Sequence, residues 1–247
     1  MHNQKVTPRT TAALLAAAFA AIGAGPASAA TVIPADAEKL SNERTLTRFA
    51  HASARGFIRT APAVSAKARA PIKLDTELDL PNVYLVLRRW TDPDDGREWL
   101  LVRIPQRPNG KIGWLQRDRV GPLHTTRKRI VVNRRTLRLT LYRDGKRIFR
   151  APVGIGEPST PTPAGKFWIR ERLKLRGSGG LYGALAFGTA AYSTLSDWPK
   201  GGVVGIHGTN QPGLIPGRPS HGCIRMKNRH ILRLGRLIRV GTPVRIR

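Results

Sequence analysis

The sequence predicts a mainly β protein made of two β domains, with one short helix close to the C-terminus. Short runs of β-branched and aromatic residues recur along the chain, and Pro, Gly, Asp and Asn separate them. The dipeptide Asp144-Gly145 in "RDGK" is a strong hairpin signal in the second half. Clear helical spacing of apolar residues follows at Ile231, Leu234 and Leu237–Ile238.

The first 29 residues have the features of an export signal. Lys5 and Arg9 precede the apolar run Ala12–Gly25, and Pro26–Ala30 supplies the small residues of a cleavage site, which we place after Ala29. The apolar run has 14 residues, whereas about 20 are needed to span a bilayer. We therefore expect an exported protein without a transmembrane anchor.

Residues 30–70 are rich in Ala, Ser and Arg. Leu40, Leu46 and Phe49 form a sparse apolar set that is compatible with one helix, and "RTAPAVSAKARAP" after it has the composition of a linker. We expect a flexible, partly helical linker over 30–70.

Residues 71–124 change character and predict a small β module. "VYLVLRRW" (Val83–Trp90), "EWLLVRI" (Glu98–Ile104) and "IGWLQ" (Ile112–Gln116) are short β-prone runs, and the turn signals "DPDDG" and "RPNG" separate them. The run "RPNGKIGWL" resembles the tail of bacterial SH3-like modules. That resemblance implies a binding or spacer role, and the module contains no catalytic constellation.

From residue 127 to 247 the sequence predicts a second domain of mostly strands. Val131, Leu137, Leu139 and Leu141 fit one face of a pleated pair, with arginines on the other face. "GKFWIRERLKL" is another strand candidate, and "LYGALAFGT" and "GGVVGIHGT" follow it. After the helix at "NRHILRLGRLI", the segment "GTPVRIR" closes the domain as a strand.

The charge is strongly positive, with 43 Lys and Arg against 15 Asp and Glu, a net charge of +28. Such a balance suggests an anionic partner. Export and the scarcity of aromatic residues among the basic ones disfavour nucleic acid. Anionic wall polymers that carry carboxylates or phosphates fit better, and an arginine-rich coding bias remains open as the bland alternative.

The single cysteine, Cys223, stands out because exported proteins usually pair their cysteines. It is either a reactive thiol or an incidental buried one. His207, His221 and His230 are close to it in sequence, and a neighbouring histidine can activate a thiol as a thiolate–imidazolium pair. No Asp or Glu follows Asp197, so a backbone carbonyl is the expected group that orients the histidine.

Zinc is the main competing use of this cluster. Cys223 and the three histidines are all potential ligands, but the paired spacing of structural zinc sites is absent. A C-x-x-C redox motif is absent too. The spacing therefore disfavours zinc and a disulfide oxidoreductase.

Glycines flank both key residues. Gly222 allows a tight turn whose amides converge on one point, as an oxyanion hole requires, and Gly205 and Gly208 flank His207. The helix that begins after Cys223 can bring a positive dipole end near the thiol.

Three motifs carry a resemblance to a known family. "HGTN" followed by "SHGCIRM" resembles the signature of L,D-transpeptidase catalytic domains, with His207 sixteen positions before Cys223. "TPTPAGKF" (Thr160–Phe167) resembles the Thr-Pro-x-Gly-x-Phe/Tyr element of that family, and "GVVGIHG" resembles its strand leading to the histidine. The order of histidine before cysteine also argues against papain-like peptidases. The resemblance implies a β-sandwich catalytic domain over 127–247.

The resemblance also implies residue roles. Cys223 would be the nucleophile, His207 the base, and the carbonyl of Gly208 the group that orients His207. The amides of Gly222 and Cys223 would form the oxyanion hole. Ser220, His221 and Arg225 would bind substrate, and Arg225 suits a bidentate grip on a carboxylate.

The implied reaction is peptidoglycan cross-linking, for which no metal or organic cofactor is implied. Cys223 would be acylated by a stem tetrapeptide with release of its terminal D-amino acid, and an amine of a neighbouring stem would resolve the thioester. Water as acceptor would give an L,D-carboxypeptidase, and a free D-amino acid would give exchange. A non-catalytic wall-binding protein is the alternative of a different class. The Gly-rich segment that holds Tyr182 and Tyr192 is expected to be a loop that could cover the site, where its tyrosines or Trp198 could contact the peptide.

Overall fold

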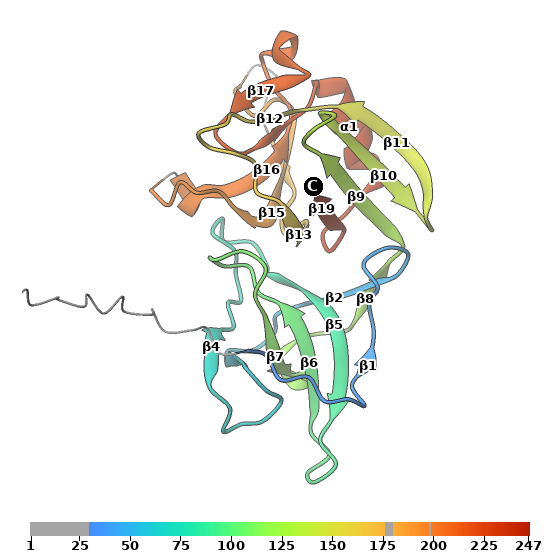
Figure 1. Cartoon of the computed structure of the whole chain (residues 1–247), viewed down its shortest axis with the longest axis vertical. Coiled ribbons are helices and arrows are strands. Elements are labelled where there is room, and N and C mark those ends of the chain that lie inside the picture. Colours follow the sequence, from blue (N-terminus) through green and yellow to red (C-terminus); the bar gives the residue numbers. More distant parts are fainter. Residues whose placement is uncertain (1–29, 176–179, 198) are drawn as a thin grey trace, which may run out of the picture.

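The computed structural model describes residues 30–175, 180–197 and 199–247 of the chain. It has an N-terminal lobe built from one sheet and a C-terminal lobe built from two sheets and a helix (Figure 1). The predicted mainly β fold, with one short helix after Cys223, is confirmed. The predicted export signal lies outside the described residues.

The N-terminal lobe is an eight-stranded sheet in the order β4-β3-β7-β6-β5-β2-β8, with β1 paired to β5. Its strands are β1 (Glu38–Lys39), β2 (Thr47–His51), β3 (Phe57–Arg59), β4 (Ala68–Pro71), β5 (Val83–Thr91), β6 (Glu98–Arg103), β7 (Ile112–Gln116) and β8 (His124–Thr126), with a 3-10 turn η1 (Arg117–Arg119) before β8. The three strands predicted in the middle of this lobe are confirmed as β5, β6 and β7. The SH3-like identity of the lobe stays a prediction.

The prediction of a flexible, partly helical linker over 30–70 is wrong. This segment contributes four strands, and β2 lies between β5 and β8 in the sheet. Phe49 of β2 is buried, because it packs in the core rather than on the face of a helix. Strands this short carry little periodic signal, and pairing with residues distant in sequence overrides their local preference.

The C-terminal lobe packs two sheets around one core. The first has the order β11-β10-β9-β19-β13, and the second has the order β14-β15-β16-β18-β12-β17. The strands are β9 (Lys128–Asn133), β10 (Arg138–Arg143), β11 (Lys146–Pro152), β12 (Gly154–Gly156), β13 (Gly165–Trp168), β14 (Leu173–Lys174), β15 (Leu185–Tyr192), β16 (Val203–His207), β17 (Gly217–Ser220), β18 (Ile224–Arg225) and β19 (Pro243–Ile246). The helix is α1 (Asn228–Leu237), and 3-10 turns occur at η2 (Pro199–Gly202) and η3 (Pro212–Leu214).

The hairpin of β10 and β11 is confirmed, but the expected apolar face is partly wrong. Leu139 lies opposite Val132 and Leu141 lies opposite Ile130, and all four are fully buried. Val131 is therefore on the other face of β9, because side chains alternate along a strand. Leu137 precedes β10 with a φ of 51° and belongs to the turn.

The Gly-rich segment expected to be a loop contains a strand. All eight residues of β15 are buried, and the strand pairs with both β14 and β16. Small residues are needed here: a Cβ on Gly188 would lie 2.2 Å from Oε2 of Glu171. Tyr192 lies at the end of β15 and faces the interface between the lobes, where its hydroxyl bonds to Glu77.

The two lobes share one hydrophobic core. Phe49, Val83 and Leu85 of the N-terminal lobe belong to the same buried cluster as the core of the C-terminal sandwich. The indole N–H of Trp168 donates to the carbonyl of Val83 at 2.8 Å. Such a continuous apolar interface holds the lobes together. In the described ranges, no helix has the length and apolar character needed to cross a bilayer.

Candidate active site

His207 ends strand β16, where the neighbouring backbone determines its orientation. Its Nδ1 lies 2.6 Å from the carbonyl oxygen of Gly208. A carbonyl only accepts hydrogen bonds, so Nδ1 carries the proton and Nε2 of the neutral ring is an acceptor. The ring of Tyr182 packs edge-on against His207 with centroids 4.8 Å apart. These two contacts restrict the imidazole to one tautomer and one orientation.

Gly208 can make this contact because it has no side chain. A Cβ there would lie 2.2 Å from Oδ1 of Asn228, the first residue of α1. That same Oδ1 accepts a hydrogen bond from the amide of Thr209 at 3.1 Å. The start of α1 therefore packs directly against the backbone that orients His207.

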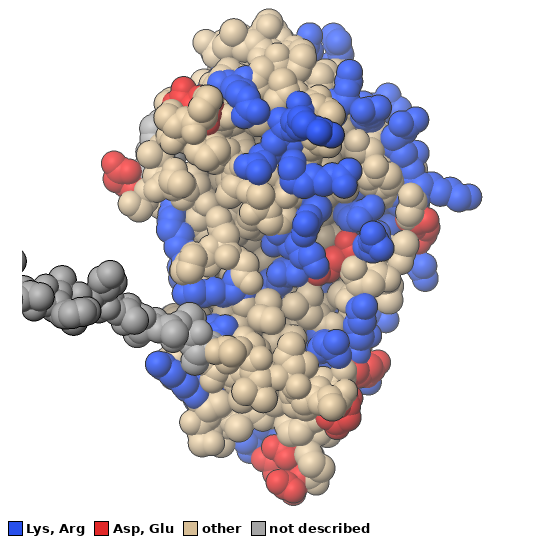
Figure 2. All heavy atoms as spheres, in the orientation of Figure 1, with Lys and Arg blue, Asp and Glu red and all other residues tan. Residues whose placement is uncertain are grey.

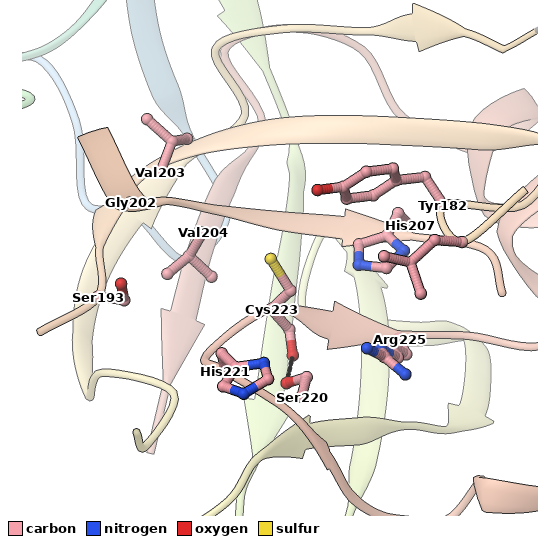
Figure 3. Close-up of a pocket in the computed structure, with 11 residues that line it drawn as sticks. Tyr182, Ser193, Gly202, Val203, Val204, His207, Ser220, His221, Cys223 and Arg225 are labelled. Carbon is pink, nitrogen blue, oxygen red and sulfur yellow. Dashed lines mark hydrogen bonds between the residues drawn. The ribbon is translucent and has the colours of Figure 1, made fainter. Parts of the chain in front are cut away.

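Cys223 lies in the turn between β17 and β18, with its thiol directed toward β16 (Figure 3). The amide of Gly205 donates to its Sγ at 3.4 Å. Gly222, just before it, has a φ of 120°, which favours glycine, and a Cβ there would lie 3.1 Å from Cβ of Ser193. The turn thus needs glycine both for its conformation and for the close approach of the segment at Ser193.

The protonation states differ from the expected thiolate–imidazolium pair. Burial lowers the pKa of His207 to about 4; the carbonyl of Gly208 raises it in part and the charge of Arg225 lowers it further. Burial also raises the pKa of the Cys223 thiol, although the Gly205 amide and Arg225 act in the opposite direction. Both shifts favour a neutral thiol beside a neutral imidazole in the free protein.

Two hydroxyl groups hold the cysteine turn in place. Ser220 donates to the carbonyl of Cys223 at 2.6 Å and accepts from the amide of Gly222 at 3.3 Å. Thr162, fully buried, donates to the carbonyl of Gly222 at 2.8 Å and accepts from the amide of Gly156 at 2.8 Å. Ser220 thus bonds to the backbone and also lines the cavity at Cys223, and its predicted contact with substrate stays a prediction. Thr162 was not singled out, although its motif "TPTPAGKF" was.

Two cavities meet at the cysteine. One, of about 40 Å³, lies on the side of Ser193, Val204, His221 and Arg225. The other, of about 260 Å³, is lined mainly by apolar side chains. Both cavities include Tyr182, Val203, His207 and Cys223 in their walls. The thiol and the imidazole are therefore accessible from two chemically different directions.

Arg225 and His221 both line the smaller cavity. Arg225 of β18 bonds to the side-chain oxygen of Gln211 at 3.2 Å, and its buried Nε has no hydrogen-bond partner in the described part of the chain. His221 is exposed, and its Nε2 lies 3.8 Å from Glu157. Figure 3 shows the Arg225 side chain below His207, to the right of Cys223, and His221 to the left of Cys223. The smaller cavity is thus lined by five of the predicted residues: His207, Ser220, His221, Cys223 and Arg225.

The N-terminal lobe contributes to the larger cavity, which sequence analysis missed. Glu77 and Leu78 line it together with Leu173, Phe187 and Cys223. Nothing in the local sequence marks Leu78, because its position depends on contacts between residues about a hundred positions apart.

A buried charge network fixes that part of the N-terminal lobe. Arg170, 1% exposed, lies 2.9 Å from Glu77 and also donates to Oδ1 of Asn82. The hydroxyl of Tyr192 donates to Glu77 at 2.6 Å. Burial alone would raise the pKa of Glu77, but Arg170 and Tyr192 outweigh it and the pKa is lowered. Glu77 is therefore an ionised anchor between the lobes.

A second loop of the N-terminal lobe holds the segment beside the cysteine turn. Arg107 donates to the carbonyls of Ser193, Leu195 and Gly201 at 2.8 to 3.0 Å. Asn109 exchanges two hydrogen bonds with the backbone of Tyr192. Since Ser193 packs on Gly222, this loop supports the cysteine turn from outside.

The zinc alternative has no geometric support. Within the described residues, no group of three or more His, Cys, Asp or Glu side chains is arranged to hold a metal ion. His230 lies on α1, where its ring contacts Arg229, and it does not line either cavity. Trp198, suggested as a peptide contact, lies outside the described residues.

Comparison with known proteins gives consistent matches for the C-terminal lobe. A family model described as the L,D-transpeptidase catalytic domain matches residues 127–246. The Bacillus licheniformis protein named "Putative L,D-transpeptidase YkuD" is 37% identical over 119 residues, which cover 47% of this chain and 62% of that protein. The Bacillus subtilis protein named "Putative L,D-transpeptidase YqjB" is 33% identical over 127 residues, which cover 47% of this chain and 69% of that protein.

A solved structure matches the same part of the chain. The catalytic domain of an Enterococcus faecium L,D-transpeptidase is 28% identical, with a TM-score of 0.36, and the match covers 49% of this chain and 96% of that domain. The chain spans 62% and 58% of the length of the Bacillus licheniformis and Bacillus subtilis YkuD proteins. The N-terminal lobe lies outside the family match.

Proposed function

The chain belongs to the L,D-transpeptidase catalytic-domain family, and from this membership we propose that it is an exported cysteine acyltransferase that cross-links peptidoglycan. The observation that carries the proposal is the position of Cys223 and His207 where two cavities meet. A transpeptidase needs such access, because an acyl donor and an amine acceptor must reach one thiol from different sides.

The first half-reaction is acylation. Nε2 of His207 accepts the thiol proton as Sγ of Cys223 attacks the carbonyl carbon between the third residue and the terminal D-amino acid of a stem tetrapeptide. The tetrahedral intermediate collapses when the imidazolium returns the proton to the leaving nitrogen. A thioester forms and the terminal D-amino acid leaves. The neutral starting pair suits this concerted proton transfer, because the ring is already a free base at neutral pH.

The second half-reaction is transfer. An amine of a neighbouring stem enters by the cavity that the thioester leaves open, and His207 accepts its proton as the nitrogen attacks. The carbon–sulfur bond breaks, an amide joins the two stems, and the sulfur regains its proton from the imidazolium. Water would give hydrolysis and a free D-amino acid would give exchange by the same thioester.

We assign the main oxyanion donor to the amide of Cys223. The carbonyl of Gly222 bonds to Thr162, and in a trans peptide the next N–H points the opposite way. Within the described residues no hydrogen bond involves that N–H. The amide of Gly222 is directed at Ser220 Oγ instead, so it contributes only if it leaves that partner.

Arg225 is our candidate for the group that binds a substrate carboxylate. Its guanidinium lies at the smaller cavity with an unpartnered buried Nε, and a fork of donors suits a carboxylate. His221, exposed at the rim, would contact the same substrate, and Ser220 would act through the turn that it holds.

Intact-protein mass spectrometry with a carbapenem tests the nucleophile and the base. Wild type should form one stable adduct. Cys223→Ala should form none, and His207→Ala should acylate about 100-fold more slowly because it lacks the base. His230→Ala is the matched control, since His230 lies outside both cavities, and it should acylate like wild type.

Incubation with disaccharide-tetrapeptide separates the possible acceptors. A cross-linked dimer supports the transpeptidase. Tripeptide alone would assign a carboxypeptidase, and a folded wild-type protein that forms no carbapenem adduct would favour a non-catalytic wall-binding protein.

A further inference from the structure

The sheet β11-β10-β9-β19-β13 has one apolar face and one cationic face. Its inner face contributes Ile130, Val132, Leu139, Leu141 and Val244 to the core. The register places Lys166, Arg245, Val131, Thr140 and Arg150 in one row across all five strands on the outer face. We call the outer cations together the basic face: Arg129, Arg138, Arg147, Arg150, Lys166 and Arg245.

This charge is not balanced by carboxylates. Residues 127–247 contain 25 Lys and Arg but only four Asp and Glu. In the described part of the chain, Lys166 is the only member of the basic face with an ion pair, at 3.2 Å from Glu43, and Arg103 holds the same carboxylate at 2.7 Å. Figure 2 shows Lys and Arg gathered over the side of the upper lobe that carries β9, β10 and β11, with few acidic side chains among them.

A groove of about 460 Å³ crosses this face at the border of the N-terminal lobe. Arg44, Arg129, Tyr142, Lys166 and Arg245 line it. The Nε of Arg129 is buried without a hydrogen-bond partner among the described residues, and its guanidinium lies 5.0 Å above the ring of Tyr142. Burial lowers the pKa of Arg129, and the charge of Arg44 adds to this effect. The Arg129 guanidinium therefore has an unused hydrogen-bond donor and like-charged neighbours. A bound anion would accept from that donor and offset the repulsion between the positive charges.

Protection of a sheet edge does not explain the pattern. Positive side chains on β11 would serve to block edge-to-edge aggregation, because β11 is an edge strand. Arg129 and Arg245, however, lie on the interior strands β9 and β19, where no edge needs protection. These interior positions favour a binding role for the face.

We propose that the basic face is a second, non-catalytic contact with peptidoglycan, which it binds through the carboxylates of stem peptides. This inference rests on the proposed function. The face lies on the outside of the sandwich, whereas His207 and Cys223 belong to the other sheet. A polymer can therefore occupy both surfaces at once, and a weak second contact raises the effective concentration of stems at the thiol.

Sedimentation with purified sacculi tests the proposal. The sacculi are first treated with hydrofluoric acid, which removes phosphate polymers, and the full chain carries Cys223→Ala to prevent acylation. Arg150→Glu/Arg245→Glu is the test variant, since both residues are exposed and neither lines the site. Arg55→Glu/Arg97→Glu is the matched control, with the same charge change on exposed residues of the N-terminal lobe.

We expect the parent and the control to sediment with the sacculi, less so as salt is raised, and the test variant to bind about tenfold more weakly. Equal binding by the test variant would overturn the proposal. So would binding only to sacculi that keep their phosphate polymers, because a phosphate polymer would then be the partner.

Two further measurements keep the outcomes separable. In the chain with Cys223 intact, Arg150→Glu/Arg245→Glu should react with a soluble carbapenem at the wild-type rate. If wild type fails to react while sedimentation behaves as expected, the proposed function is wrong and the contact stands. If the glutamate variant does not fold by circular dichroism, Arg150→Gln/Arg245→Gln replaces it, and an unchanged affinity would again overturn the proposal.

Discussion

Burial shifts the pKa values of Cys223 and His207 in opposite directions, because the charged form of the thiol is negative and that of the imidazole is positive. Loss of solvent disfavours the thiolate and the imidazolium alike, so the thiol pKa rises and the imidazole pKa falls. The pair is therefore poised for proton transfer during attack, instead of being ionised beforehand. In the proposed mechanism the Gly208 carbonyl takes the place of the carboxylate in a catalytic triad and adds no negative charge.

The pH dependence of acylation should report this state. His207 is an effective base only when neutral, and its pKa is about 4, so the second-order rate of carbapenem acylation should fall as pH drops through about 4. Between about pH 5 and 8 the rate should be nearly flat. Stopped-flow measurement across this range checks it, with circular dichroism to confirm folding at each pH. An inflection near the ordinary imidazole pKa would contradict a neutral imidazole, and a steady rise toward alkaline pH would show that a thiolate formed without His207 is the attacking species.

Thr162 tests how strongly the cysteine turn depends on a single hydroxyl. Thr162→Val keeps the shape but leaves the Gly156 amide and the Gly222 carbonyl without this partner. We expect a loss of about 1–3 kcal/mol in the free energy of unfolding. Acylation should be about 10- to 100-fold slower, because the Cys223 amide is no longer held in the orientation that the oxyanion needs. Thr162→Ser should restore most of both. An unchanged acylation rate in a destabilised Thr162→Val would show that the hydroxyl matters for folding alone.

At the scale of elements, the segment after β15 is held from outside its own lobe. Its backbone carbonyls at Ser193, Leu195 and Gly201 accept from one guanidinium, that of Arg107. Arg107 also stacks 5.1 Å from the ring of Tyr192. One side chain of the N-terminal lobe thus orders a wall of the smaller cavity.

Removal of Arg107 should loosen that wall. In Arg107→Ala we expect faster hydrogen exchange at the Ser193 and Leu195 amides and acylation roughly 3- to 30-fold slower, because the site is less well ordered. Arg107→Lys should recover little, since an ammonium cannot reproduce the planar fork. Arg97→Ala, at an exposed arginine of the same lobe, is the control. If exchange at Ser193 and Leu195 matches wild type in Arg107→Ala, the segment holds itself without the N-terminal lobe.

The elements that local patterns predicted correctly are those that one signal dominates. The β10–β11 hairpin follows from its Asp-Gly turn, and α1 follows from the spacing of its buried Ile231 and Leu234. By contrast, β15 is buried on both faces, so it lacks alternation, and its small residues resemble those of a loop. The strands in 30–70 were missed for a related reason, because their partners are distant in sequence.

At the scale of the whole molecule, two carboxylates connect the lobes. Glu43 bonds to Arg103 of its own lobe and to Lys166 of the other, and Glu77 bonds to Arg170 and Tyr192. Burial alone would raise the pKa of Glu43, but Arg103 and Lys166 outweigh it and the pKa is lowered, as it is for Glu77. Their contribution to stability is therefore complete above 4.5, the ordinary pKa of the group, and is lost as pH falls below it toward the folded-state values.

Thermal unfolding should reveal this contribution. At neutral pH, Glu43→Gln and Glu77→Gln should each lose about 1–3 kcal/mol of stability. The larger loss should be in Glu77→Gln, which leaves the buried Arg170 without its carboxylate. The difference in Tm from wild type should shrink as pH is lowered through 4.5 toward 3, because wild type then loses the same charges. A difference that stays constant with pH would assign the loss to packing.

The sequence by itself determined the family and the candidate nucleophile, through a lone thiol, an upstream histidine and the glycines around them. These features can be recognised in the sequence alone, because each motif consists of a few neighbouring residues. The net positive charge likewise follows from the composition, but the composition does not tell on which surface the Lys and Arg side chains lie together.

The tertiary structure alone decided which groups surround that chemistry. Leu78 and Arg107 reach the site from segments more than 100 positions away in sequence, so no periodicity or motif connects them to Cys223. Thr162 lies in a motif that the sequence singled out, but only the fold shows that its hydroxyl holds the cysteine turn. The neutral state of the pair was also decided there, because a pKa depends on how much solvent the fold removes. The basic face exists as a surface only because strand pairing aligns cations from five separate strands.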